Sequence, residues 1–167
     1  MTAAQYTKWS RPFRENPTLK GALILYNTIA TYALALGFLI ALGALLWLRD
    51  ERFLRVCLSP AAGLVIVSLV RILVNRKRPY ETLDIEPLLK KKKSGQSFPS
   101  RHTFSAFAVS TAIFFLLPAV GIVCAVLSAL LAVARVILGV HYPSDVIFGA
   151  LFGVGLTALG LHLPLPL

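Results

Sequence analysis

The sequence has little charge and very few acids. Only 14% of its 167 residues are charged, 7 residues are Asp or Glu, and Asp145 is the only acid after Glu86. Soluble domains carry roughly 25% charged residues, so this composition argues against a water-soluble globule. We also expect no acidic cluster that could hold magnesium.

Cysteine is scarce as well. Cys57 and Cys124 both lie in apolar runs, without CxxC or Cys/His spacing. We therefore expect two small hydrophobic side chains in membrane helices rather than a disulfide or a metal site. The first 20 residues lack the compact apolar stretch of a signal peptide, because cations and prolines interrupt them. The first apolar helix is then expected to direct insertion.

What the sequence does have is apolar bulk, with 57% hydrophobic residues and a mean hydropathy of +0.75. The apolar runs are long enough for bilayer-spanning helices of about 20 residues. These runs are residues 21–48, 56–74, 103–134 and 146–163. Pro118 and Gly121 divide the third run into two antiparallel spans. The sequence therefore predicts an all-α, polytopic membrane helix bundle with about five transmembrane helices in a single domain, residues 21–167.

Two smaller features complete the predicted architecture. Residues 1–20 mix aromatic and basic side chains, which suits an N-terminal interfacial segment lying along the lipid headgroups, although a frayed polar terminus fits equally well. The last span is rich in glycine, which would permit close helix packing. These glycines are Gly149, Gly153, Gly155 and Gly160.

Alternation of the five spans brings three groups of polar residues to one membrane face. They are Arg71 and Arg78 at the end of the second span, Ser100, Arg101 and His102 at the start of the third, and Arg135, His141 and Asp145 around the junction of the last two. Ionisable residues near membrane spans are costly and point to function. Arginine forks match phosphate oxygens, and the helix N-terminus after Pro99 also favours an anion.

The spacing of His141 and Asp145 is one helical turn. It would let the carboxylate accept the Nδ1 hydrogen of the imidazole, leaving Nε2 unprotonated and nucleophilic. His102 would supply a proton to a leaving oxygen. Each residue alone has an ordinary structural interpretation, as a snorkelling arginine or a helix-start residue, so the hypothesis rests on their joint order and spacing.

These residues resemble the three-part signature of the type 2 phosphatidic acid phosphatase superfamily, which also includes the vanadium haloperoxidases. That signature reads KxxxxxxRP, PSGH and SRxxxxxHxxxD. The chain has RILVNRKRP from Arg71, PSRH from Pro99 and ARVILGVHYPSD from Ala134. With the flanking spans, the resemblance covers about residues 56–163 and is that of a compact, bacterial-type member.

The resemblance implies a metal-independent membrane lipid phosphatase that acts through a phosphohistidine intermediate. It gives His141 as nucleophile, His102 as acid and base, and Asp145 as the carboxylate that stabilises the imidazolium. The implied phosphate-binding residues are Arg71, Arg78, Ser100, Arg135 and Arg101. The implied substrate is a lipid monophosphate or diphosphate, such as a polyprenyl diphosphate, phosphatidylglycerol phosphate or phosphatidate.

The same resemblance sets the expected partners and location. We expect a lipid phosphate and membrane lipids as partners, no nucleic acid, no metal or other cofactor, and a multi-pass protein of the cell membrane. Oligomeric state is left open. So is the membrane face, because a positive-inside count places the basic face in the cytoplasm while many bacterial relatives are thought to work outside.

The chain departs from the family pattern at three motif positions, since Arg71 replaces lysine, Arg101 replaces glycine and Ala134 replaces serine. The family core usually has six spans, and here the first is expected to be missing or reduced to residues 1–20. Two rival hypotheses follow from the same residues. A vanadium haloperoxidase is disfavoured by the apolar composition, and a non-enzymatic polyprenyl-phosphate binding or carrier protein is disfavoured by the pairing of His141 with Asp145.

Overall fold

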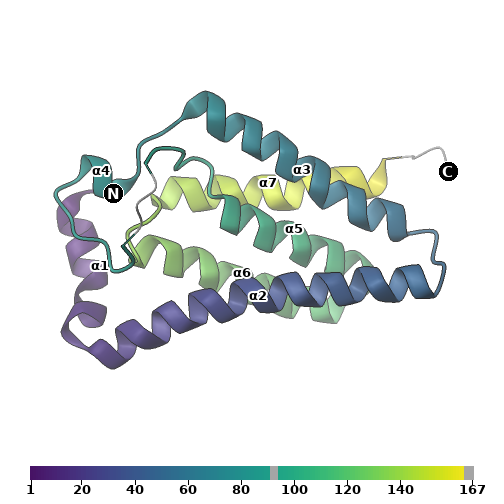
Figure 1. Cartoon of the computed structure of the whole chain (residues 1–167), viewed down its shortest axis with the longest axis horizontal. Coiled ribbons are helices and arrows are strands. Elements are labelled where there is room, and N and C mark those ends of the chain that lie inside the picture. Colours follow the sequence, from purple (N-terminus) through teal and green to yellow (C-terminus); the bar gives the residue numbers. More distant parts are fainter. Residues whose placement is uncertain (91–93, 164–167) are drawn as a thin grey trace.

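The structure is a computed structural model that describes residues 1–90 and 94–163, and over these residues the chain is helical, with no strand. Five long helices run lengthwise, and a shorter one, α1, lies across one end of them (Figure 1). The helices are α1 Ala3–Glu15, α2 Pro17–Trp47, α3 Phe53–Val74, α4 Pro79–Thr82, α5 Arg101–Leu116, α6 Pro118–Ile137 and α7 Pro143–His162. The predicted all-α architecture is confirmed.

Proline and capping residues determine where the long helices begin. Asn16 caps α2 by accepting from the backbone of the next turn, and Pro17 takes the first helical position, where its missing N–H costs nothing. The helix therefore begins earlier than the predicted start at residue 21. The predicted break in the third apolar run is confirmed, because α5 ends at Leu116 and α6 begins at Pro118.

Four segments of the described chain are long and apolar enough to cross a membrane. They are Pro17–Trp47, Phe53–Thr82, Pro118–Ile137 and Pro143–His162. Large apolar side chains on their outer faces are exposed, such as Leu36 and Ile40 on α2 and Leu73 on α3. α5, predicted as a further span, has 16 residues and is shorter than the about 20 that a span needs. It lies within the bundle and contacts α2, α3, α6 and α7.

Glycines on α7 allow this close approach of α5. A Cβ at Gly149 would lie 2.7 Å from the carbonyl oxygen of Ser100, and one at Gly153 would lie 2.6 Å from that of Phe104. Gly160 likewise faces Ser59 on α3, at 2.7 Å from its Oγ. The predicted packing role is confirmed for these three glycines and is wrong for Gly155, which faces open space.

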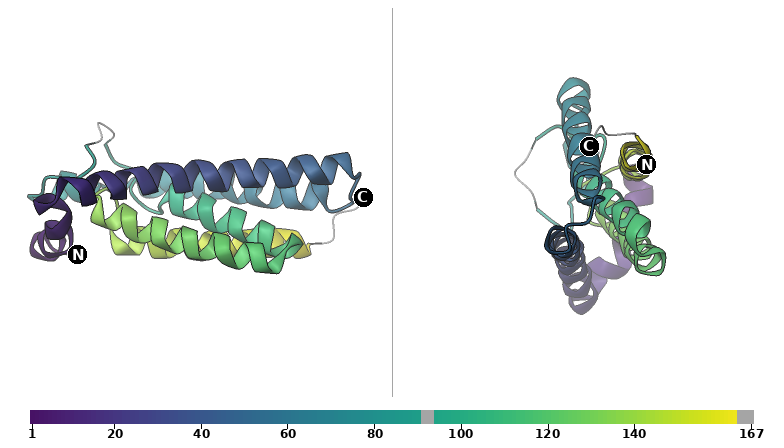
Figure 2. Two further views of the ribbon diagram at one scale, coloured as in Figure 1. Left: turned by 90° about the horizontal axis from the view of Figure 1, so that it is seen from below. Right: turned by 90° about the vertical axis from the view of Figure 1, so that its right-hand side faces the viewer.

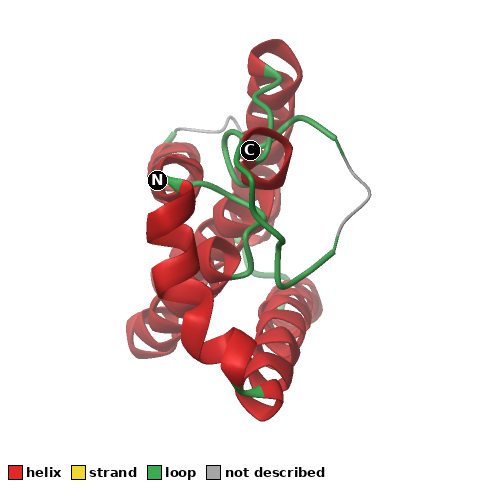
Figure 3. Cartoon of the chain, turned by 90° about the vertical axis from the view of Figure 1, so that its left-hand side faces the viewer, coloured by secondary structure: helices red, strands yellow, loops and turns green. Residues whose placement is uncertain are grey.

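The N-terminal segment is folded and docked rather than frayed. α1 begins with a capping box between Thr2 and Gln5 and crosses the end of the bundle (Figure 3). Tyr6 is fully buried, donates from its hydroxyl to the carbonyl of Glu86 and accepts from the N–H of Leu88. The helix is thereby held against the long polar loop between α3 and α5.

The polar segments gather at one end of the elongated bundle (Figure 2). This end holds α1, the loop that contains α4, and the turn between α6 and α7. Gly139, in that turn, has a φ of 77° and packs on the ring of Tyr6, so the turn, the loop and α1 form one assembly. The other end carries the charged turn between α2 and α3. Cys57 and Cys124 are free, as expected.

Candidate active site

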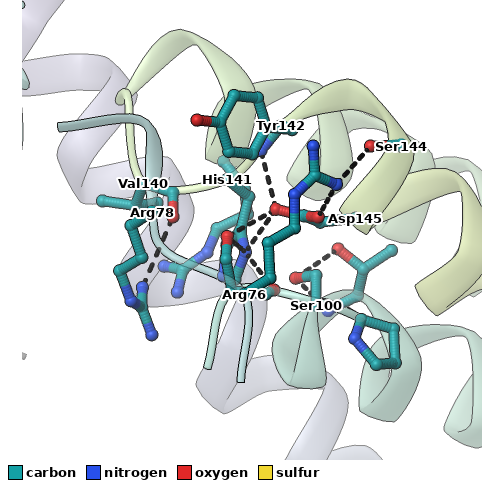
Figure 4. A network of polar contacts seen from close by, with 12 residues as sticks. Arg76, Arg78, Ser100, Val140, His141, Tyr142, Ser144 and Asp145 are labelled. Carbon is teal, nitrogen blue, oxygen red and sulfur yellow. Dashed lines mark hydrogen bonds and ion pairs between the residues drawn. The ribbon is translucent and has the colours of Figure 1, made fainter. Parts of the chain in front are cut away.

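Three segments that are distant in the sequence meet at the polar end. Arg71, near the end of α3, donates from Nη1 to the carbonyl oxygen of Pro99. The N–H of Ser100, at the start of α5, donates to the carbonyl oxygen of Asp145 on α7 at 2.8 Å. The structure therefore brings together the three predicted groups of site residues (Figure 4).

His141 is buried, with 2% of its surface exposed. Its Nδ1 atom lies 3.0 Å from the carbonyl oxygen of Ser97. A carbonyl oxygen only accepts, so Nδ1 carries the ring hydrogen and Nε2 is left with its lone pair. This is the tautomer that the sequence predicted, but a backbone carbonyl holds it in place of the expected carboxylate.

Asp145 is fully buried at the first turn of α7, and most of its contacts are to other partners (Figure 4). Its Oδ1 accepts from Nη1 of Arg76 at 2.9 Å, while its Oδ2 accepts from the hydroxyl of Ser97 and from the N–H of Tyr142. The distance from Oδ2 to Nδ1 of His141 is 3.6 Å, too long for a hydrogen bond but close for an ionic contact. The carboxylate therefore acts on the imidazole mainly as a charge.

The surroundings of His141 keep its ring neutral. The pKa of His141 is lowered to about 4, chiefly by burial; the charges of Arg135 and Arg78 act in the same direction, and Asp145 opposes them. Neutral imidazole is the nucleophilic form. The ring of His141 is therefore neutral over the whole physiological pH range.

Three guanidinium groups are buried at this end of the bundle. Arg71, Arg78 and Arg135 are 5%, 4% and 1% exposed, and Arg78 lies within electrostatic range of the other two. Arg78 donates to the carbonyl oxygens of Gly95 and Val140. In the part of the chain that the structure describes, none of the three forms an ion pair with a carboxylate. Buried charges are costly without a counterion, so the cluster is suited to a bound anion.

Arg135 connects this cluster to His102. Its Nη2 lies 3.0 Å from Nδ1 of His102, and its Nη1 donates to Oδ1 of Asn27 at 3.0 Å. Arginine has only donors, so Nδ1 of His102 accepts and the ring hydrogen is on Nε2. The hydrogen of the His102 ring therefore lies on the side away from Arg135.

The two remaining predicted residues have different surroundings. Ser100 is fully buried, and its hydroxyl caps α5 by accepting from Thr103. A hydroxyl that accepts still has its own hydrogen to donate. Arg101 is exposed, so it stands apart from the three buried arginines, although it is close enough to repel Arg71.

A groove of about 210 Å³ begins beside His102 and runs between α2, α5 and α6. Arg101 and His102 lie in its wall together with an otherwise mainly apolar set of residues. These residues are Thr31, Leu34, Ala35, Ser105, Ala106, Val109 and Leu131. The groove is therefore cationic beside the site and mainly apolar elsewhere.

The described residues contain no group of three or more His, Cys, Asp or Glu side chains that could hold a metal ion. The charges available to an anion at this site are those of arginines.

Sequence reasoning missed three residues that shape the site: Arg76, Ser97 and Asn27. Arg76 lies inside the first motif and also stacks on the ring of Tyr142, at 4.2 Å from its centroid. Ser97 lies two residues before the PSRH motif, so its proximity to a motif was the only available signal. Asn27 is the one buried polar side chain of α2, and nothing in the sequence linked it to Arg135.

Comparison with known proteins agrees with this geometry. The family model described as "PAP2 superfamily" matches residues 52–166. The bacitracin transport permease protein BcrC of Bacillus licheniformis is 39% identical over 82 residues, which are 49% of this chain and 40% of that protein. The undecaprenyl-diphosphatase BcrC of Bacillus subtilis is 34% identical over 86 residues, 52% of this chain and 44% of that protein. The matches thus span less than half the length of these relatives.

Two solved structures share the fold. The crystal structure of Aquifex aeolicus LpxE has a TM-score of 0.77 at 22% identity and covers 97% of this chain and 95% of that one. The PAP2-type phosphatidylglycerolphosphate phosphatase of Bacillus subtilis has a TM-score of 0.73 at 24% identity, covering 94% and 83%. At these identities the likeness concerns the fold.

The fold and the site define a multi-pass helical membrane protein with a buried histidine set among arginines at one end of its bundle. The family match covers most of the chain and includes all three motifs. The chain belongs to the PAP2 superfamily, and the resemblance of its motifs to that family is confirmed.

Proposed function

We propose that the protein is a metal-independent lipid phosphatase. The observation that supports this most is the set of three buried guanidinium groups, Arg71, Arg78 and Arg135. They have no carboxylate partner among the described residues and lie at the same end of the bundle as the neutral His141. A phosphoryl group supplies the missing negative charge and accepts two hydrogen bonds from each fork. The names of the relatives, an undecaprenyl-diphosphatase and a phosphatidylglycerolphosphate phosphatase, support the same class of reaction.

In the first step, Nε2 of His141 attacks phosphorus in line with the bond to the lipid oxygen. The bond between Nε2 and phosphorus forms, the bond to the lipid oxygen breaks, and that oxygen leaves with the electron pair. His102, whose ring hydrogen is on Nε2, donates to the leaving oxygen. The arginines hold the other phosphoryl oxygens as charge develops on them, and Asp145 stabilises the imidazolium that forms.

In the second step, water replaces His141 on phosphorus. One proton of that water neutralises the leaving oxygen, while His102 keeps its own Nε2 hydrogen. The bond between phosphorus and Nε2 breaks, inorganic phosphate is released, and His141 returns to its starting state. Each residue uses the same contacts in both steps, so no large rearrangement is required.

A lipid substrate fits the apolar surroundings of the site. The groove beside His102 provides a mainly apolar path between helices for the first carbons of a chain. Its place beside His102 puts the chain on the side of the leaving oxygen. The candidate substrates are a polyprenyl diphosphate, phosphatidylglycerol phosphate and phosphatidate.

Residues 1–20 and the membrane location are part of the proposal. α1 crosses the end of the bundle with Trp9 exposed and basic side chains around it, which suits a helix lying at the headgroup level of the cell membrane. Residues 21–167 then form the single phosphatase domain. Labelling a Lys90→Cys variant in intact cells with a membrane-impermeant thiol reagent tests which face carries the site, because Lys90 is highly exposed at that end.

The direct test is phosphate release from lipid phosphates in detergent with EDTA present. We expect release by the wild type and by His162→Ala, since that histidine only packs edge-to-face against Phe115 in α5. His141→Ala should release at least about 1,000-fold less. Acid-labile radioactive phosphate on His141 after rapid quenching would support the covalent step. Equal release by the wild type and His141→Ala would contradict the proposed function.

A further inference from the structure

We propose that Arg101 determines substrate choice by binding the phosphate that remains on the lipid, so that the chain prefers lipid diphosphates to lipid monophosphates. This inference rests on the proposed function and narrows its substrate class. It concerns the residue that stands where the family motif has glycine.

The position of Arg101 sets it on the leaving-group side of the site. Arg71, Arg78 and Arg135 are buried, whereas Arg101 is exposed and lines the mainly apolar groove next to His102. In the proposed mechanism His102 marks where the leaving oxygen lies. Arg101, in the same wall of the groove, therefore lies beside the leaving group. The buried arginines instead bind the phosphoryl group that is transferred.

The chemical difference between the two substrate classes is the charge on the leaving group. A lipid monophosphate releases a neutral alcohol, which gives Arg101 nothing to bind. A lipid diphosphate releases a lipid phosphate, an anion on which charge grows as the bridging bond breaks. A guanidinium group at this position stabilises that charge in the transition state. Its repulsion of Arg71 is also relieved when an anion lies near both.

The contact between Arg135 and His102 favours the same conclusion independently. Because Arg135 donates to Nδ1, that atom is occupied as an acceptor, and His102 is held as a neutral ring with its hydrogen on Nε2. A neutral imidazole is a much weaker acid than an imidazolium. An alkoxide leaving group needs full protonation, whereas a lipid phosphate leaves readily with only a hydrogen bond. The site is therefore better suited to cleaving an anhydride than an ester.

In this reaction the terminal phosphoryl group of the lipid diphosphate is transferred to His141. Nε2 of His141 bonds to the terminal phosphorus, the bond from that phosphorus to the bridging oxygen breaks, and the bridging oxygen keeps the electron pair on the lipid phosphate. Arg101 and the Nε2 hydrogen of His102 bind that oxygen and its neighbours. Water then releases inorganic phosphate from His141. The products are one lipid monophosphate and one inorganic phosphate.

The test compares farnesyl diphosphate with farnesyl monophosphate, which share one chain, on the wild type, Arg101→Gly and Arg101→Lys. We expect the wild type to prefer the diphosphate. In Arg101→Gly, kcat/KM should fall about 10-fold to 100-fold for the diphosphate and by less than about 2-fold for the monophosphate. Arg101→Lys should recover part of the loss. Lys77→Ala removes one exposed cation from the same end and should leave the ratio unchanged.

The outcomes separate the inference from the proposed function. If Arg101→Gly lowers kcat/KM equally for both substrates, or if the wild type prefers the monophosphate, the proposed role of Arg101 is wrong. The proposed phosphatase activity is not affected by either result. If the wild type and His141→Ala release the same phosphate from both substrates, the proposed function itself fails. Thermal unfolding in detergent checks that each variant is folded, which we expect because Arg101 is exposed.

Discussion

The Nδ1 atom of His141 lies 3.0 Å from the carbonyl oxygen of Ser97 and 3.6 Å from the carboxylate of Asp145. The carbonyl of Ser97 and the carboxylate of Asp145 thus act on the same ring nitrogen in different ways. The carbonyl fixes which nitrogen carries the hydrogen, and the carboxylate supplies negative charge. The carbonyl belongs to the backbone, so substitution of a side chain does not remove it.

This division predicts a moderate effect of Asp145→Asn. The tautomer of His141 should survive, and kcat should fall by about 10-fold to 100-fold, since only the charge that stabilises the imidazolium is lost. Phosphate release at saturating lipid phosphate measures this change in kcat. Ser97→Ala keeps the carbonyl and should lower kcat less. A loss as complete as that of His141→Ala would show that Asp145 does more than supply charge.

The burial of His141 predicts an unusual titration. Because the pKa of His141 is lowered to about 4, its ring should stay neutral as the pH falls through 6.5, the ordinary value of histidine. Nitrogen NMR of histidine-labelled protein measures this directly, with His141→Gln to assign the signal. Titration of that signal near pH 6.5 would contradict the prediction.

The same lowered pKa makes stability depend on pH. The unfolded chain binds a proton at His141 below about pH 6.5, whereas the folded chain resists it down to about pH 4. The stabilisation is therefore complete above pH 6.5 and is lost as the pH falls from 6.5 toward 4. Thermal unfolding in detergent across this range should show a decline that is smaller in His141→Gln. An equal decline in both proteins would exclude His141 as its source.

The bond between Asn27 and Arg135 predicts that a residue of α2 affects catalysis. In Asn27→Leu, Arg135 loses its 3.0 Å contact and is no longer held against His102, so kcat/KM should fall by about 10-fold. Thr28→Val is the matched control, because Thr28 is exposed on the same helix. If Asn27→Leu lowers the melting temperature without changing kcat/KM, then Asn27 has only a structural role.

The close approach of α7 to α5 predicts a sharp difference between two glycines. Gly149→Ala places a methyl group 2.7 Å from the carbonyl oxygen of Ser100, so it should destabilise the fold by about 1–3 kcal/mol and displace the start of α5. Gly155→Ala on the same helix meets open space and should be neutral or slightly stabilising. Thermal unfolding of both variants, together with phosphate release, measures the difference. Similar melting temperatures would contradict it.

Local signals in the sequence were sufficient for the helices and for most of the site. Long apolar runs predicted the long helices, because burying charge in lipid is costly. Pro118 marked the break between α5 and α6, because it lacks an N–H. The alternation of helices then placed the three motifs at one end. The contact of Tyr6 with the loop could not be predicted from the sequence, because it joins residues about 80 positions apart.

The division of roles within the site was decided only by the tertiary structure. The sequence determined that His141 and Asp145 lie one turn apart, but the backbone path of the loop before α5 placed the carbonyl of Ser97 closer to the ring than the carboxylate. Likewise, the sequence supplied five arginines in the motifs. The tertiary structure buried Arg71, Arg78 and Arg135, paired Arg76 with Asp145 and left Arg101 in the groove. Composition and spacing determine which groups are present. Which of them touch depends on how helices distant in the sequence pack together.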